Sequence, residues 1–151
     1  RAIQRWPVKT QSTEQSYIKD YKNAASIYIA QAREKGYAET LLGRRRYLRN
    51  INSKNNAVRQ FEERVAINMP IQGTSADMIK IAMINIFNEL NKRKAKTKMV
   101  LQVHDELLFD AHKDEVDDLR PVIKKLMETA IPLKVPIVVD TGVGDNWLDA
   151  H

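Results

Sequence analysis

The chain has 151 residues, of which 43% are hydrophobic and 29% charged; this is typical of a folded globular protein and excludes a disordered chain. It has no cysteine, which excludes disulfides and thiolate metal sites, and no apolar run approaches the ~20 residues of a membrane-spanning helix. The formal net charge is +6, and residues 33–64 hold nine Lys and Arg against four Glu. This local excess favours a polyanionic partner, nucleic acid before membrane.

The first third of the sequence predicts a loose end, a long helix and a hairpin. Residues 1–12 lack a clear period, so we expect a loop or frayed end there. Apolar residues recur at helical spacing over 13–34, and Gly36 is the usual type of residue to end such a helix. The stretch 37–48, with Gly43 in its loop, predicts a short β-hairpin.

A second helix is predicted after the polar stretch 50–56. Ser53 is placed to cap this helix, which we expect to run to about Asn68. The side chains expected to face inward are Ala57, Val58, Phe61 and Val65. Pro70 then predicts an interruption of the helical run.

A third helix is predicted to begin near Thr74 and to reach about Asn91. Thr74 and Asp77 have the spacing of a capping box, although Asp in place of Glu makes the match imperfect. The side chains expected to be buried are Ile79, Ala82, Met83, Ile86 and Leu90.

The last third changes to the period of strands. The runs 98–103 and 107–110 flank His104-Asp105-Glu106 and predict an antiparallel hairpin. A helix over 113–130 follows, which Pro121 is expected to kink or split.

The chain then ends with a predicted strand at 137–139, and Gly142 and Gly144 are expected to form a turn. This order of elements predicts an α+β fold.

Asp105 and Glu106 are the first candidates for chemistry. Apolar strands would hold the backbone while the turn exposes the carboxylates, and carboxylate oxygens are suited to hold Mg²⁺ for phosphoryl transfer. A polar hairpin turn without catalytic role is the alternative, and His104 could equally be a turn residue with a local hydrogen bond.

Two further patterns fit nucleic acid. Arg44, Arg45 and Arg46, followed by Asn52 and Lys54, provide guanidinium, ammonium and amide groups that bind phosphates. A solvated basic loop is the alternative.

Arg64 and Asn68 share a helix face, and Gln72 follows just beyond Pro70. Such a polar row could hydrogen-bond to acceptors in the DNA minor groove, where readout is nearly blind to sequence. An exposed polar face without a ligand is the alternative.

Taken together, these segments resemble the polymerase I enzymes of DNA polymerase family A, with correct order and spacing from Ala32 to His151. The stretches that carry the resemblance are Gly36-Tyr37, Thr40 to Leu48, Ile51-Asn52-Ser53, Glu63-Arg64, Ala66-Ile67-Asn68, Pro70 to Thr74, Ala76 to Lys80, Gln102 to Leu107 and Gly142 to Trp147. The stretch Gln102 to Leu107 is similar to the family's motif C. The resemblance implies a partial polymerase domain: a palm-type antiparallel sheet hairpin with packed helices and part of the fingers over 36–151, after a poorly matching segment over 1–35.

The resemblance also implies roles. Asp105 would be a catalytic metal ligand, Glu106 would assist near the metals, and His104 would support the primer terminus. The residues expected to contact DNA are Arg44, Arg45, Arg46, Asn52, Lys54, Arg64, Asn68, Gln72 and His104. The implied reaction is attack of a primer 3′-hydroxyl on the α-phosphate of a deoxynucleoside triphosphate, with two Mg²⁺ ions, or alternatively Mn²⁺, at the reacting oxygens.

The family's motif A aspartate and its fingers helix are not found in the chain. We therefore expect a DNA-directed DNA polymerase as the parent protein, in the bacterial cytoplasm with the nucleoid and away from membranes, and no polymerisation by this chain alone. A non-catalytic DNA-binding remnant is the main alternative. A metal-dependent phosphohydrolase would need further ligands such as Asp110 or Asp140, and Asp110 would lie ~13 Å from Glu106 along a strand.

Overall fold

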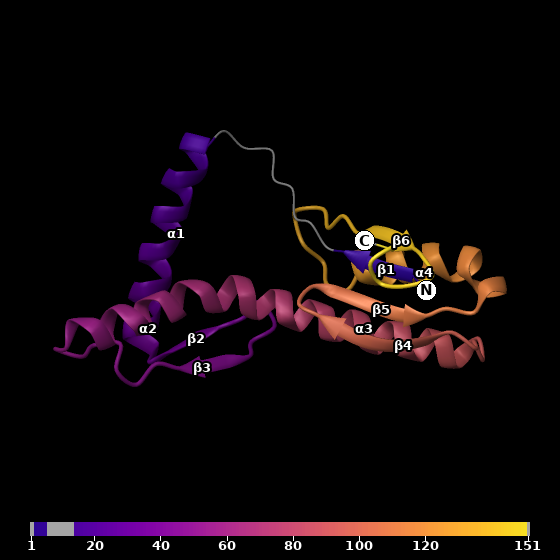
Figure 1. The fold of residues 1–151 in the computed structure, drawn as a ribbon. Helices are drawn as coiled ribbons and strands as arrows, with labels where there is room; N and C mark the ends of the chain where they lie inside the picture. Colours follow the sequence, from indigo (N-terminus) through magenta and orange to yellow (C-terminus); the bar gives the residue numbers. More distant parts are fainter. Residues whose placement is uncertain (1, 6–13, 151) are drawn as a thin grey trace. The chain divides into compact units, whose positions relative to one another are not determined.

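The structure is a computed structural model that describes the backbone of residues 2–5 and 14–150 and the side chains of residues 23–150. The chain divides into two compact units, a helical unit and a sheet unit (Figure 1). The helical unit is Thr10–Asp77, and the sheet unit is Arg1–Lys9 together with Met78–His151. Both helices and antiparallel strands are present, so the predicted α+β class is confirmed. Within the described ranges, no helix is long and apolar enough to cross a membrane.

The sheet unit is built on four antiparallel strands in the order β4-β5-β1-β6. The strands are β1 (Ala2–Arg5), β4 (Lys98–Val103), β5 (Glu106–Asp110) and β6 (Asp140–Val143). The predicted hairpin of β4 and β5 is confirmed. The loop predicted over 1–12 is wrong at residues 2–5, which form β1; four residues are too few to show a period. Residues 1 and 6–12 lie outside the described residues.

The last strand lies later than predicted. Residues 137–139 are not a strand; Val139 is fully buried, and its backbone N–H donates to Glu128 Oε1 at 3.1 Å instead of to a neighbouring strand. The turn expected at Gly142 is also wrong, because Gly142 lies in β6 opposite Ile3. A Cβ on Gly142 would come within 1.9 Å of the Ala150 carbonyl oxygen, so glycine here serves close backbone packing.

Two helices supply the core of the sheet unit. They are α3 (Thr74–Lys92), from Met78 onward, and α4 (Val116–Glu128), which follows the short 3₁₀ turn η2 (Lys113–Glu115). Leu107 and Phe109 are two residues apart on β5, so both point to the same face of the sheet. There they pack with buried side chains of both helices. The predicted core residues of α3 are confirmed, with Met83 only partly buried against that cluster.

Pro121 does not split the helix. α4 runs through this residue, which is exposed, while Leu119, Ile123 and Met127 form the buried face. Pro121 has no N–H to donate to the carbonyl four residues earlier, and the helix continues without that hydrogen bond.

The helical unit contains α1 (Glu14–Lys35), a hairpin of β2 (Tyr37–Glu39) and β3 (Arg45–Tyr47), α2 (Asn56–Asn68) and the π turn η1 (Met69–Gly73). The predicted helix over 13–34 and the predicted hairpin are confirmed; Gly36, at φ +75°, ends α1. The small core consists of Ala32, Ala38, Leu48, Ile51 and Ala66.

The start of α2 differs from the prediction. Asn55 is the N-cap, and its side-chain oxygen accepts the backbone N–H groups of Ala57 and Val58 at 3.0 and 3.4 Å. Ser53 instead accepts the Asn55 N–H. Ala57, Val58 and Phe61 were expected inward but are exposed, because α2 joins the core only near Val65 and Ala66.

The predicted end of α2 near Asn68 is confirmed, but α2, η1 and α3 form one continuous helical path that passes through Pro70. Residues 56–92 are helical throughout, and the proline lies inside η1. Pro70 has no N–H to donate to the Ala66 carbonyl four residues earlier, and the helix accommodates this by widening to a π turn. The predicted capping box is wrong for the same reason, because Thr74 continues a helix that has already begun.

Candidate nucleic-acid interface

The carboxylate turn is His104-Asp105 between β4 and β5, with Glu106 as the first residue of β5. Val103 pairs with Glu106, which leaves a two-residue loop, and His104 has φ +52° to close it. The side-chain amide of Gln102 donates to the His104 carbonyl at 2.7 Å. His104 and Asp105 are exposed and Glu106 is half-buried.

The turn is anchored by apolar packing. Leu107 and Phe109, which follow Glu106 on β5, are 0% and 1% exposed. A β-bulge between Met99 and Leu101 adds local twist to the facing strand. The sequence therefore exposes the Asp105 carboxylate to solvent just before the first residue of β5, a strand that the core holds in place.

The polar row consists of Arg64 and Asn68 on α2 and Gln72 in η1, and all three side chains are exposed. Four residues along an α-helix advance the direction by about 40° beyond a full turn. Residues in a π turn advance less per step, so η1 offsets part of the further drift and keeps Gln72 closer to the line of the first two. None of the three side chains hydrogen-bonds within the described part of the chain, so their donors and acceptors are available to a ligand.

The three arginines of the basic hairpin have different surroundings. Arg44 donates from Nε to Asp77 Oδ1 at 2.7 Å and from Nη2 to the Gly73 carbonyl at 3.0 Å. Its guanidinium therefore joins the hairpin to the helical path, a contact that the sequence pattern did not predict.

Arg45 stacks over the Tyr37 ring, with its Cζ 4.5 Å from the ring centroid, and pairs with Glu39 at 3.3 Å. Arg46 is exposed, and its side chain makes no ion pair or hydrogen bond with other described residues. Asn52 and Lys54 are also exposed, in the segment before α2. Of the five residues predicted to contact the DNA backbone, Arg46, Asn52 and Lys54 present their side chains most openly.

Thr74 and Gly73 form the other side of the hairpin contact. The Thr74 hydroxyl accepts the Leu41 N–H at 3.0 Å and donates to the Pro70 carbonyl. A Cβ on Gly73 would come within 2.6 Å of the Thr40 methyl carbon. We call this group the clamp: Thr40 to Arg44 on the hairpin loop, and Gly73, Thr74 and Asp77 on the helical path. Sequence reasoning missed it because Thr74 and Asp77 also have capping-box spacing.

A complete metal site is not formed by the described residues. Among them, no group of three or more His, Asp or Glu is close enough to hold an ion. Asp105 and Glu106 supply oxygen donors of the type that Mg²⁺ and Mn²⁺ prefer, so they suit part of a coordination sphere. The phosphohydrolase alternative, with Asp110 or Asp140 as further ligands, gains no support.

The clearest electrostatic shift in the sheet unit is at Glu115. Its carboxylate accepts the backbone N–H groups of Lys96 and Thr97, both at 2.9 Å, and the Thr97 hydroxyl at 2.7 Å. The hydrogen bond from the Lys96 N–H, followed by those from Thr97, lowers the pKa of Glu115 to about 2. These hydrogen bonds fix the start of α4 to the segment before β4.

The fold is that of a partial polymerase domain of α+β type with an antiparallel palm-like hairpin. The family model described as DNA polymerase family A matches residues 7–149, which reaches further toward the N-terminus than the resemblance from Ala32. The chain belongs to DNA polymerase family A.

Individual relatives agree with this assignment. DNA polymerase I of Lactococcus lactis subsp. cremoris is 43% identical over 148 residues, covering 93% of this chain and 17% of that protein. The thermostable DNA polymerase I of Thermus thermophilus is 45% identical over 122 residues, covering 81% and 14%. The solved polymerase domain of Pol1 from M. smegmatis, in complex with DNA primer-template and dNTP, matches with a TM-score of 0.84 at 43% identity, covering 85% of this chain and 23% of that one. The chain thus spans less than a fifth of the length of these two curated relatives.

Proposed function

We propose that the chain is the C-terminal part of a DNA-directed DNA polymerase that adds deoxynucleotides to the 3′ end of a primer. The polar row would contact primer and template in the minor groove, and Arg44 to Arg46, Asn52 and Lys54 would lie near the DNA backbone. The observation that carries this proposal is the polar row itself: in a family A chain, three exposed polar side chains follow one helical path and have no hydrogen-bond partner among the described side chains. A cytoplasmic, nucleoid-associated location is part of the same proposal.

The catalytic contribution of the chain would come from the carboxylate turn. Asp105 would hold a metal ion, Glu106 would lie beside it, and His104 would support the primer terminus. Bound Mg²⁺ or Mn²⁺ ions in such a polymerase stabilise the attacking and leaving oxygens of the in-line displacement. The chain's own part would be to hold the Asp105 carboxylate just before the start of β5, where Leu107 is buried in the core.

We further propose that the 151-residue chain does not extend a primer by itself. The described residues lack a three-ligand group, which supports the view that a second carboxylate, from motif A, must come from the parent protein. Primer extension assays with Mg²⁺ and all four deoxynucleoside triphosphates should show no product. Measurable extension by the pure chain would contradict this part of the proposal.

DNA binding is tested by titrating the chain into a labelled primer–template duplex across a salt series. Affinity should fall steeply with salt, and Arg64→Ala should weaken binding further. Arg93→Ala is the matched control, because it removes the same charge from the turn after α3, where Arg93 pairs with Glu89 at 2.6 Å. Equal losses in the two variants would show that net charge alone acts, and would overturn the assignment of the polar row.

A further inference from the structure

We infer that Thr74 is a positioning residue, which holds the π turn η1 and so sets the direction in which Gln72 meets the DNA minor groove. This inference rests on the function proposed above. Thr74 is only 5% exposed, so it acts through Gln72 and touches no DNA itself.

The need for such a residue begins at Pro70. In a regular α-helix, the Pro70 carbonyl would accept the Thr74 backbone N–H, four residues later. Here that N–H goes to the Ile71 carbonyl, three residues back. The Thr74 hydroxyl donates to the Pro70 carbonyl in its place. The hydroxyl thus satisfies a carbonyl that the irregular turn leaves without its usual donor.

The same hydroxyl connects the turn to the hairpin. It accepts the Leu41 N–H at 3.0 Å, from the loop that joins β2 to β3. That loop is itself fixed, because Gly43 N–H donates to the Thr40 carbonyl and Arg44 N–H to the Thr40 hydroxyl. Thr74 therefore ties the wide turn to a hydrogen-bonded loop.

The remaining clamp contacts act in the same direction. Arg44 joins the Gly73 carbonyl and Asp77, one residue before Thr74 and three after it. Gly73 lets the Thr40 methyl group approach, since a Cβ there would come within 2.6 Å of it. Gln72 is the exposed residue immediately before this buried pair, Gly73 and Thr74. Its direction relative to Arg64 and Asn68 is consequently set by the turn that the clamp holds.

The first part of the test measures hydrogen exchange of the Leu41 amide in four variants. Thr74→Val keeps the shape and removes the hydroxyl, and should speed exchange about tenfold. Thr74→Ser should restore slow exchange, and Thr74→Cys, a weaker donor and acceptor of similar size, should lie between. Thr129→Val is the control, because Thr129 makes the same type of bond to the Lys125 carbonyl, at 2.7 Å. If the valine variant does not fold, the serine–cysteine pair still decides, and equal exchange in those two overturns the inference.

The second part measures DNA binding with single 3-deazaadenine substitutions near the primer terminus, which remove the minor-groove N3 acceptor. In the unmodified chain, the base substitution should weaken DNA binding about fivefold at the position that Gln72 contacts. That position is identified as the one where Gln72→Ala removes the difference in affinity between modified and unmodified DNA. Thr74→Val or Thr74→Cys should abolish it at that position and leave the Arg64-dependent positions sensitive. Thr74→Ser should retain it.

The outcomes separate the two proposals. No sensitivity at any position in the unmodified chain would overturn the proposed function, and the role of Thr74 with it. Sensitivity that survives in Thr74→Val at the Gln72 position would overturn the role of Thr74 alone. A loss of affinity in Thr74→Val that is uniform over all DNA positions would also overturn the role of Thr74, because general destabilisation gives that result.

Discussion

The carboxylate turn and the polar row are held in place by different kinds of force. The turn follows from strand pairing and from Leu107 and Phe109 in the core, with one polar contact, from Gln102, closing the loop. The direction of the polar row at Gln72 instead depends on a few specific hydrogen bonds around Thr74 and Arg44. Apolar anchoring tolerates the loss of any single polar group, whereas a buried hydrogen bond that loses one partner leaves the other unsatisfied. The two regions should therefore respond differently to mutation.

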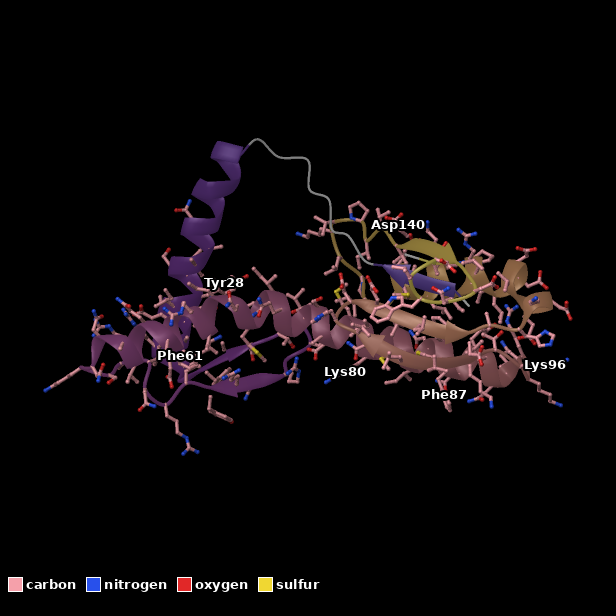
Figure 2. All side chains as sticks on the ribbon, viewed as in Figure 1. Tyr28, Phe61, Lys80, Phe87, Lys96 and Asp140 are labelled. Atoms are coloured by element: carbon pink, nitrogen blue, oxygen red, sulfur yellow. The ribbon has the colours of Figure 1, made fainter. Side chains whose placement is uncertain are left out.

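The largest effect is expected in the sheet core. Phe109→Ala should lower the free energy of unfolding by about 3–5 kcal/mol, because it removes a fully buried ring. Phe87→Ala is the matched control in the same unit, since this α3 side chain is 58% exposed and points outward (Figure 2). Denaturant unfolding measures the free energy of unfolding of both variants, and hydrogen exchange of the β5 amides measures the local effect. Losses of similar size would show that the turn is not anchored by the β5 core.

In the helical unit, Gly73→Ala should destabilise the clamp by about 1–3 kcal/mol, because the new methyl group forces Thr40 away. Alanine's better helix propensity, about 1 kcal/mol, offsets part of that loss. Ser75→Ala is the control, because Ser75 is exposed on the same helical path. Thermal unfolding checks the difference, and a stabilised Gly73→Ala variant would show that the close approach of the hairpin is wrong.

A smaller effect is expected at the start of α2. Asn55→Ala should cost about 1 kcal/mol, because it removes the acceptor for two free N–H groups. Ser53→Ala should cost less, since it removes a hydroxyl that accepts one N–H, that of Asn55 at 3.2 Å, and leaves the Ser53 carbonyl bonded to Arg59. The reverse order in denaturant unfolding would restore Ser53 as the cap.

The smallest expected difference is at Glu115 and depends on pH. Because its pKa is lowered from 4.5 to about 2 in the folded chain, the carboxylate stabilises the fold above about pH 4.5. This contribution is lost as the pH falls from 4.5 toward 2. Glu115→Gln keeps one acceptor oxygen and should be less stable than the unmodified chain at pH 6, with a gap that narrows as the pH falls. A gap that stays constant between pH 6 and pH 2.5 would rule out titration of Glu115 as its source.

Periodicity accounts for what the sequence predicted correctly. The β4–β5 hairpin and the core face of α3 rest on apolar spacing, and the β2–β3 hairpin rests also on the glycine in its loop. β1 was missed because four residues show no period. The apolar residues Ile137 and Val139 predict a strand at 137–139. The chain there contributes to the core but pairs with no strand.

The candidate site divides in the same way. The carboxylate turn was predictable because strand patterns flank it. The clamp was not, because Thr74, Asp77 and Arg44 are far apart in sequence and each has a simpler local interpretation. Tertiary hydrogen bonds replaced the capping box at Thr74 and occupy the Arg44 guanidinium that the pattern assigned to DNA. The predicted DNA and metal roles of the individual residues stay predictions.

The central claim is that the polar row is the DNA-reading surface of this chain. It is tested most directly by adding unlabelled primer–template duplex to the isotope-labelled chain and recording the NMR shift of every amide and side-chain amide. The largest changes should fall on the side-chain signals of Asn68 and Gln72 and on residues near Arg64, while Glu115 stays unchanged. Binding whose largest shifts lie elsewhere, with the polar row unaffected, would contradict the account.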